Sequence, residues 1–265
     1  MANSSAFKTN IVISCRFVEK VVFPYFGGGF PRRLSSLEQT DEQREASRFS
    51  SFVRARSGLR RLIFSNAWNF SSSVGRSYPP VFLTQTYRDS VTDLGEGNFH
   101  FQQFVQRLNY QENLNLKYVT VPEFQQRGSV HHHTLFFNFP FVPLDRLRWI
   151  WGKGEQMNVQ KLRSLRAAGD YLSKYLSKGR DDSRLFRKRR YSPSEGLFRP
   201  VVISEPSAVQ SVLLRLPEMP ETSLDFGVRY SSKLLDSPFP LFDFEKPVCY
   251  AENRILNNFD SGEMV

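Results

Sequence analysis

The stretch Val130-His131-His132-His133-Thr134-Leu135-Phe136-Phe137 decides the fold, and it holds three of the four histidines in the chain. It follows a turn signal at Arg127-Gly128 and ends in an apolar run, which is typical of a buried β-strand. Because side chains alternate along a strand, His131 and His133 should point to one face and His132 to the other. Two imidazoles on one face can share a metal ion. The alternative is a surface strand or turn with solvated histidines.

The run before the turn, residues 116–124, also has strand character, so a hairpin with its loop centred on Arg127 is expected. Positions equidistant from the centre pair, which places Glu123 opposite His131 with Cβ atoms about 4.5–5.5 Å apart. Glu123, His131 and His133 then form a facial set suited to Mg²⁺, Mn²⁺, Zn²⁺ or Fe²⁺. A register slip of one residue would turn Glu123 away. The alternative is a surface Glu123 that pairs with Arg127.

A predicted helix at about residues 161–178 carries Tyr171, Lys174, Tyr175 and Lys178 at positions i, i+3, i+4 and i+7, hence on one face. A phenol with its pKa near 10 is a weak nucleophile, but nearby positive charge or a metal favours the phenolate and its attack on phosphorus. The alternative is a structural helix, with tyrosines packed on the core and lysines in solvent.

Composition indicates a folded, basic protein. The 265 residues include 25 Phe, 10 Tyr and 3 Trp, and the net charge of +10 with a pI near 9.7 favours a polyanionic partner, either nucleic acid or an acidic membrane surface. No apolar run is long enough to span a membrane, and no signal-peptide core is evident, so a soluble intracellular protein is expected. Cys15 and Cys249 lie far apart without metal-type spacing, which fits a reducing compartment.

The rest of the chain divides into three expected regions: 1–77 with a strand and a basic amphipathic helix, a core at 78–199, and a C-terminal extension at 200–265. Thr40 and Gln43 form a capping-box signature at the start of the first helix. The arginine-rich segment 180–190 is expected to be solvated and flexible, with nucleic-acid binding as an alternative role. Residues 227–233 lack the second glycine of a P-loop, so a built-in nucleotide-driven motor is not expected.

In combination, these motifs resemble the HUH endonucleases, in particular the rolling-circle replication initiators of bacterial plasmids and single-stranded DNA phages. Three family motifs occur in order, and Glu123 matches the upstream carboxylate of related initiators. The motifs are Phe82-Leu83-Thr84-Gln85-Thr86, His131-His132-His133, and Tyr171 to Lys174. Two departures stand out: the middle of the histidine motif is usually bulky and apolar, and the tyrosine motif is repeated as Tyr175 to Lys178. We therefore expect His132 to be structural, and either one or two nucleophiles.

The resemblance implies an α+β fold: an antiparallel sheet of about five strands (an RRM-like palm), with helices packed on one face and extensions at both ends, the C-terminal one irregular. It implies Mg²⁺ or Mn²⁺ held by Glu123, His131 and His133. Tyr171, ranked slightly ahead of Tyr175, would attack single-stranded origin DNA to give a 5′-phosphotyrosyl link and a free 3′-hydroxyl. Lys174 or Lys178 would stabilise charge or activate the phenol. Thr84 and Thr86 are expected to support the sheet.

The implied partners are single-stranded origin DNA, a host helicase and a host DNA polymerase, with no membrane, and the implied location is the cytoplasm of a bacterial host. Three alternatives stay open: a relaxase or single-strand transposase with the same chemistry, a non-haem iron enzyme, and a nucleic-acid-binding module whose metal site is only structural.

Overall fold

The computed structural model describes residues 7–24, 40–154, 156–179, 182–186, 188–216, 221–225 and 228–234. The chain forms two compact units, one of residues 52–197 and one of residues 1–51 together with 198–265. This grouping differs from the division at residues 77 and 199 that the sequence suggested, because the two ends of the chain share one unit. Within the described residues, no helix is both long and apolar enough to cross a membrane.

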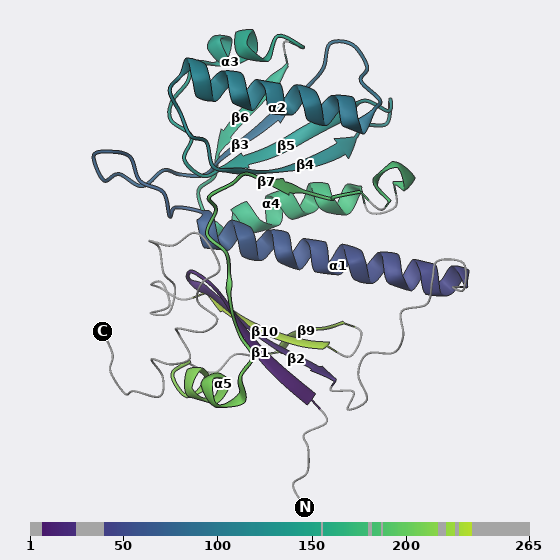
Figure 1. Ribbon diagram of the computed structural model, residues 1–265, viewed down its shortest axis with the longest axis vertical. Coiled ribbons are helices and arrows are strands. Elements are labelled where there is room, and N and C mark those ends of the chain that lie inside the picture. The colour runs from purple at the N-terminus through teal and green to yellow at the C-terminus, as the bar shows by residue number, and fades with distance from the viewer. Residues whose placement is uncertain are drawn as a thin grey trace, which may run out of the picture. The chain divides into compact units, whose positions relative to one another are not determined.

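The unit of residues 52–197 is built on a five-stranded antiparallel sheet (Figure 1), with the strand order β6-β3-β5-β4-β7. The strands are β3 (Val81–Gln85), β4 (Tyr118–Phe124), β5 (Val130–Phe136), β6 (Met157–Lys161) and β7 (Ser192–Pro193). The histidine strand β5 is central, and each of its residues is buried. The predicted α+β class, the five-stranded antiparallel sheet and the central place of the histidines are confirmed.

Helices α2 (Leu94–Gln111) and α3 (Leu144–Trp151) build the apolar core on one face of this sheet. Asp93 caps α2 by accepting a hydrogen bond from the Glu96 backbone N–H, and α3 ends at Gly152, whose φ of 63° is the left-handed conformation that glycine adopts readily. The core combines aromatic residues of the helices and the sheet: Phe101, Phe104, Phe136, Phe139 and Trp151.

Helix α4 (Leu165–Lys178) covers the other face, so the helices are not confined to one face of the sheet as expected. Figure 1 shows α2 and α3 on one side and α4 on the other. Leu172 and Leu176 of α4 are buried. The physical reason lies in β5 itself: all of its residues are shielded from water, so both faces of the central strand need a covering layer.

Helix α1 (Asp41–Asn66) begins with the predicted capping box, in which Thr40 and Gln43 exchange side-chain to backbone hydrogen bonds of 3.0 and 3.3 Å. Its second half belongs to the unit of residues 52–197 and packs on α4. The approach is close at Gly169, where an added Cβ would lie 2.7 Å from the Phe64 ring. A larger residue at this position would push the two helices apart.

The other unit contains a second antiparallel sheet with the strand order β8-β1-β2-β10-β9. Its elements are β1 (Phe7–Ser14), β2 (Phe17–Pro24), β8 (Val201–Ile203), α5 (Pro206–Leu213), β9 (Glu221–Asp225) and β10 (Val228–Leu234). The single strand-like run expected near the N-terminus is a hairpin, since Cys15 turns the chain with a φ of 58°. The segment after residue 200, expected to be irregular, contributes three strands and a helix, and residues 235–265 lie outside the described part.

Candidate active site

The hairpin of β4 and β5 has the predicted register. Glu123 pairs with His131, and the turn closes through a 2.9 Å hydrogen bond from the Gln125 N–H to the Ser129 carbonyl. Gly128 in this turn has a φ of 86°, a conformation that favours glycine. Glu123, His131 and His133 therefore lie on the face of the sheet that α4 covers, while His132 faces α2.

Glu123 binds two partners on this face. Its Oε2 lies 2.5 Å from His133 Nε2, and its Oε1 lies 3.0 Å from Lys178 Nζ. Burial alone would raise the pKa of Glu123, but the hydrogen bonds and charges of His133 and Lys178 hold it below its usual value. Glu123 is therefore ionised at neutral pH. The alternative pairing with Arg127 is not made, because the Arg127 guanidinium donates to Gln125 and to the Tyr87 carbonyl.

His133 is held at both of its ring nitrogens. Its Nδ1 lies 3.1 Å from the hydroxyl oxygen of Thr84, which pairs with it across β3 and β5. A hydroxyl can donate or accept, so Thr84 satisfies Nδ1 in either tautomer and leaves Nε2 directed at Glu123. Burial lowers the pKa of His133, although Glu123 opposes this shift. This contact was not foreseen from the sequence, which indicated only that Thr84 supports the sheet.

His131 presents an unused donor atom to the same face. Its Nε2 is buried and has no hydrogen-bond partner among the described residues. Burial, with smaller contributions from His133 and Arg127, lowers the pKa of His131 to about 4, so the ring is neutral at physiological pH. A neutral, buried imidazole nitrogen without a partner is a suitable ligand for a metal ion.

The donor types fit a divalent metal, but the side chains do not enclose one as they stand. No group of three or more His, Cys, Asp or Glu residues in the described part of the chain is arranged to hold a metal ion. Lys178 occupies one oxygen of Glu123, and His133 meets the other. Binding of a metal to this set would therefore require Glu123 to exchange Lys178 for the ion.

The tyrosines of α4 reach the histidine face. The Tyr175 ring stacks on the His133 ring, with centroids 3.6 Å apart, and Lys178 Nζ lies 5.0 Å from the centroid of the Tyr175 ring. Phe82 packs between these groups, edge-on to Tyr171 at 4.5 Å and stacked on Tyr175 at 5.5 Å. Phe82 belongs to the first-strand motif, whose packing role the sequence did not reveal.

The two phenols differ in their surroundings. The Tyr171 hydroxyl donates to Gln160 Oε1 on β6 over 3.4 Å. Burial, followed by the hydrogen bond with Tyr171 and the charge of Glu123, raises the pKa of Tyr175 to about 12. Of the two predicted lysines, Lys178 contacts Glu123 and Tyr175, whereas Lys174 is exposed to solvent.

His132 lies on the opposite face, as predicted, with a different set of partners. Its ring stacks on Phe101 of α2 at 4.9 Å, and its Nε2 lies 3.0 Å from Asn98 Oδ1. Full burial, with smaller contributions from the charges of His133 and His131, lowers the pKa of His132 to about 3. His132 is thus a neutral packing residue between sheet and helix.

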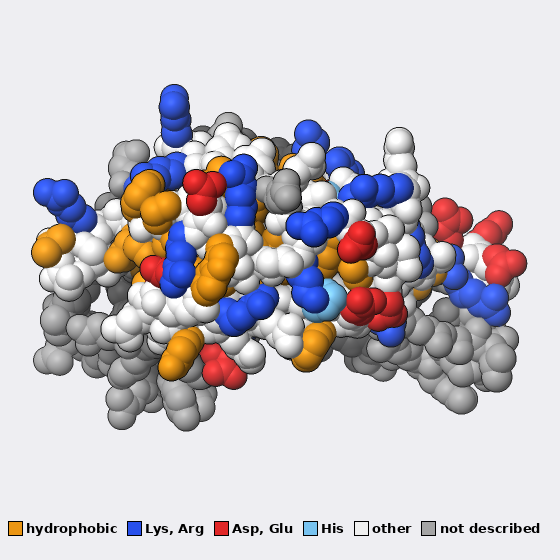
Figure 2. All heavy atoms as spheres, turned by 90° about the horizontal axis from the view of Figure 1, so that it is seen from above, with side chains coloured by type: hydrophobic (Ala, Val, Ile, Leu, Met, Phe, Trp, Pro, Cys, Tyr) orange, Lys and Arg blue, Asp and Glu red, His pale blue; other side chains and the backbone are white. Residues whose placement is uncertain are grey.

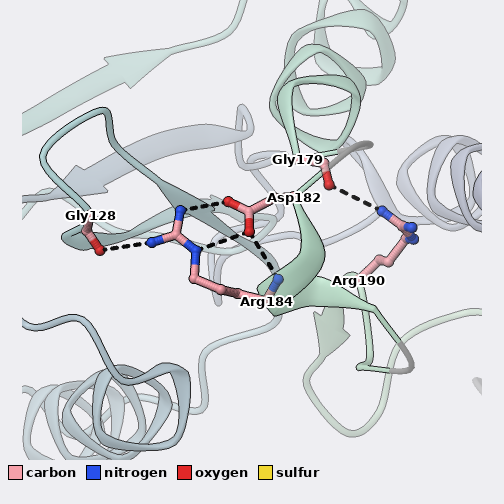
Figure 3. A network of polar contacts seen from close by, with 5 residues as sticks. All are labelled: Gly128, Gly179, Asp182, Arg184 and Arg190. Carbon is pink, nitrogen blue, oxygen red and sulfur yellow. Dashed lines mark hydrogen bonds and ion pairs between the residues drawn. The ribbon is translucent and has the colours of Figure 1, made fainter.

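A cluster of polar contacts ties the segment after α4 to the hairpin (Figure 3). Arg184 forms an ion pair with Asp182, with a shortest distance of 2.7 Å, and donates to the Gly128 carbonyl at 3.5 Å, while its guanidinium lies 3.7 Å from the Phe124 ring centroid. Arg184 belongs to the short 3₁₀ turn Ser183–Leu185 and holds the hairpin end, although the sequence indicated a solvated segment. Arg180, Asp181 and Arg187 of that segment lie outside the described residues.

Basic and apolar side chains share the surface. Figure 2 shows Lys and Arg side chains spread over the face seen from above Figure 1, with hydrophobic side chains between them. On α3, Trp149 is 64% exposed, and the Arg146 guanidinium lies 4.7 Å from the centroid of its ring. Exposed aromatic rings beside cationic groups are typical of surfaces that hold single-stranded nucleic acid.

The comparisons with known proteins bear on this same region. Residues 80–180 match a family model of replication-associated proteins, the ORF2 family. The matched segment includes the β4–β5 hairpin with Glu123 and the three histidines, and it also includes α4 with both tyrosines. Searches of curated proteins and of solved structures gave no match. The family match confirms the resemblance to rolling-circle replication initiators and supports a role in starting DNA replication.

Proposed function

We propose that this protein starts rolling-circle replication by nicking single-stranded origin DNA with a tyrosine of α4. The observation that carries the proposal is the stacking of Tyr175 on His133, with Glu123 hydrogen-bonded to the same imidazole. This contact brings a nucleophile and a set of metal-ligand side chains to one face, inside the segment that matches replication-associated proteins.

Glu123, His131 and His133 would hold Mg²⁺ or Mn²⁺, which when bound would polarise an oxygen of the scissile phosphate. Three features support this assignment: the ionised state of Glu123, the neutral state of His131, and the unpartnered Nε2 of His131. Lys178 would leave Glu123 as the site fills, and the ammonium group would then be available to the DNA phosphate.

The chemistry is a transesterification at phosphorus. The phenol oxygen forms a bond to the scissile phosphorus as the bond to the 3′-oxygen of the preceding nucleotide breaks. The phenol loses a proton and the departing 3′-oxygen gains one, so no co-reactant is consumed. The products are a 5′-phosphotyrosyl protein and a free 3′-hydroxyl from which a polymerase can extend.

Tyr171 is proposed as the first nucleophile and Tyr175 as its partner. The Tyr175 ring lies flat against His133, and its pKa of about 12 disfavours the phenolate. The Tyr171 hydroxyl points toward β6, at the open side of the sheet, where Gln160 accepts its hydrogen bond. Tyr175 lies one helical turn further on, so it is positioned for a second transfer that closes the circle.

Lys178 is proposed to stabilise charge on the phosphate during the transfer, because it already lies beside Glu123 and the Tyr175 ring. Lys174 is proposed to contact DNA from its exposed position on the same helix. A host helicase and a host polymerase would separate and copy the strands, in the bacterial cytoplasm.

The test is formation of a covalent protein–DNA adduct. Full-length protein is mixed with labelled single-stranded oligonucleotides that tile the origin region, with Mn²⁺ or with EDTA, and adducts are resolved on denaturing gels. We expect an Mn²⁺-dependent adduct that is weaker in Tyr171→Phe and absent when Tyr171→Phe and Tyr175→Phe are combined. Tyr110→Phe, at an 89% exposed position of α2, is the matched control and should behave as wild type.

Two results would count against the proposal. Absence of an adduct with every tile and every divalent metal would favour a binding module without cleavage. An adduct that persists in the double tyrosine variant would show that a different residue attacks.

A further inference from the structure

A pocket of about 690 Å³ opens at the β3–β6 edge of the sheet, next to the histidine face. Its lining residues are Thr84, Thr86, Arg148, Gln156, Met157 and Asn158. A volume of several hundred Å³ is ordinary for a site that takes a small ligand or one nucleotide.

The floor of the pocket continues the row of side chains that contains His133. Across the three strands, Asn158 pairs with Thr84 and Thr84 pairs with His133, so all three side chains share one face. One step further on, the Thr86 N–H donates to the Gln156 carbonyl over 3.2 Å. Thr86 and Gln156 thus extend the same polar floor beyond the ends of the strands.

The pocket directly adjoins the proposed reaction centre. Thr84 forms part of its lining and also lies 3.1 Å from His133 Nδ1. On β6, Gln160 accepts the hydrogen bond of the Tyr171 hydroxyl and lies two residues beyond Asn158, on the same face. A group bound in the pocket would therefore be a near neighbour of a phosphate placed between the tyrosines and the histidines.

The chemistry of the lining suits the edge of a nucleobase. The amides of Gln156 and Asn158 each offer a donor and an acceptor, and both residues are exposed to solvent. Arg148 pairs with Asp145 through Nη1, while its buried Nε has no hydrogen-bond partner among the described residues. Asn and Gln pair with adenine, and Arg pairs with guanine, through two hydrogen bonds each.

We infer that this pocket binds one purine base, from a nucleotide next to the scissile phosphate, and so sets part of the nick-site specificity. The inference rests on the proposed function. Gln156 and Asn158 read the base edge, and Arg148 adds donors at the pocket wall. Met157 supplies an apolar contact at the same wall.

The test uses full-length protein, Mn²⁺ and a pool of single strands with randomised sequence, followed by sequencing of the strands that become covalently attached. For wild type we expect purines to exceed pyrimidines about tenfold at one position beside the joined phosphate. In the variant with Gln156→Ala and Asn158→Ala, the preference at that position should fall below about twofold. Adducts should still form, and preferences at other positions should persist.

An oligonucleotide with an abasic residue at the selected position gives an independent measurement. It should lower the wild-type adduct yield to that of the double variant and leave the yield of the double variant unchanged. Val159→Ala is the matched control, because Val159 lies between Asn158 and Gln160 on β6 but points to the other face.

The outcomes separate the two proposals. Failure of wild type to form any adduct would overturn the proposed nicking function, and this inference with it. Adducts without a purine preference, or with the same preference in the double variant, would overturn the inference alone. Loss of adenine in Asn158→Ala or of guanine in Arg148→Gln would identify the base.

Discussion

The two faces of β5 carry the same side chain in different surroundings. His131 and His133 are each 4% exposed and His132 is 1% exposed, so the depth of burial does not distinguish them. The difference lies in what each face meets. One face meets Glu123, Tyr175 and Lys178, which are charged or reactive, whereas the other meets Phe101 and a single amide from Asn98.

This comparison shows that the function of a buried histidine follows from the helix that covers it. Helix α4 brings phenols and an ammonium group to its face, and α2 brings a phenyl ring. Both faces keep the imidazoles neutral, since burial lowers the pKa of all three histidines. Only the α4 face adds a carboxylate, and a carboxylate completes a ligand set for a divalent ion.

The largest expected effect is on the α4 face. His131→Ala or His133→Ala should lower Mn²⁺-dependent adduct formation by more than about a hundredfold, because even groups that only hydrogen-bond to metal ligands are worth about 10–100-fold. Rates of adduct formation on a single-stranded origin oligonucleotide measure this. Activity within about tenfold of wild type would mean that the two faces do not differ as described.

Thr84 offers a second way to sharpen the comparison, since it acts through His133. Thr84→Val removes the hydroxyl with little change in shape and should weaken Mn²⁺ affinity by about 10–100-fold. Thr84→Ser keeps the hydroxyl and should restore most of the affinity. A competition titration with a metal-sensitive dye measures both, and equal affinities for Val and Ser would show that the hydrogen bond is unimportant.

The stability of the protein should depend on pH through the buried histidines. The pKa values of about 4 for His131 and about 3 for His132 lie below the unfolded value near 6.5, so the unfolded chain binds more protons in this range. The free energy of unfolding should therefore be full above about pH 6.5 and fall as the pH drops, with His132 accounting for on the order of 2 kcal/mol at pH 5.

Urea unfolding in EDTA between pH 7 and pH 4.5 measures this dependence. His132→Leu should remove its share of the slope and leave that of His131. A slope that is identical in His132→Leu and wild type would mean that His132 takes up its proton in the folded state.

Lys178→Met should have a smaller effect on metal binding, in the opposite direction from the histidine variants. Removing the ammonium frees Glu123 Oε1 and should raise Mn²⁺ affinity about two- to fivefold, the range expected for loss of a partly exposed ion pair. Adduct formation should nevertheless decrease, since the charge near the phosphate is lost. Lys174→Met, at an exposed position of the same helix, is the control for metal affinity.

The smallest expected effect is that of His132→Leu at pH 7. Leucine can pack against Phe101, and the exposed Asn98 can bind water in place of the imidazole, so adduct formation should stay within about twofold and stability within about 1 kcal/mol of wild type. Loss of activity in a folded His132→Leu protein would give the α2 face a role that its contacts do not suggest.

Much of the hairpin could be predicted because its geometry is local. The turn around Arg127 and the alternation of side chains set the pairing of Glu123 with His131, and the confirmed register leaves the predicted residues on one face. The spacing of Tyr171, Tyr175 and Lys178 likewise indicated a common face of α4, because helical periodicity depends only on sequence separation.

The remaining features depend on long-range packing that periodicity does not encode. Spacing shows which residues share a face of α4, but not which face of the sheet the helix covers. The ion pair of Lys178 with Glu123 and the contact of Thr84 with His133 join residues that are distant in sequence. The pairing of β1 with β8 likewise brings together the two ends of the chain.

Mn²⁺ binding measured by electron paramagnetic resonance tests the central claim most directly, because the signal of free Mn²⁺ falls as the ion binds, with or without DNA. The difference between the two faces of β5 predicts one bound ion in wild type and in His132→Leu, and none at the same concentrations in His131→Ala, His133→Ala or Glu123→Gln. Equal Mn²⁺ binding by wild type and folded His133→Ala would contradict it.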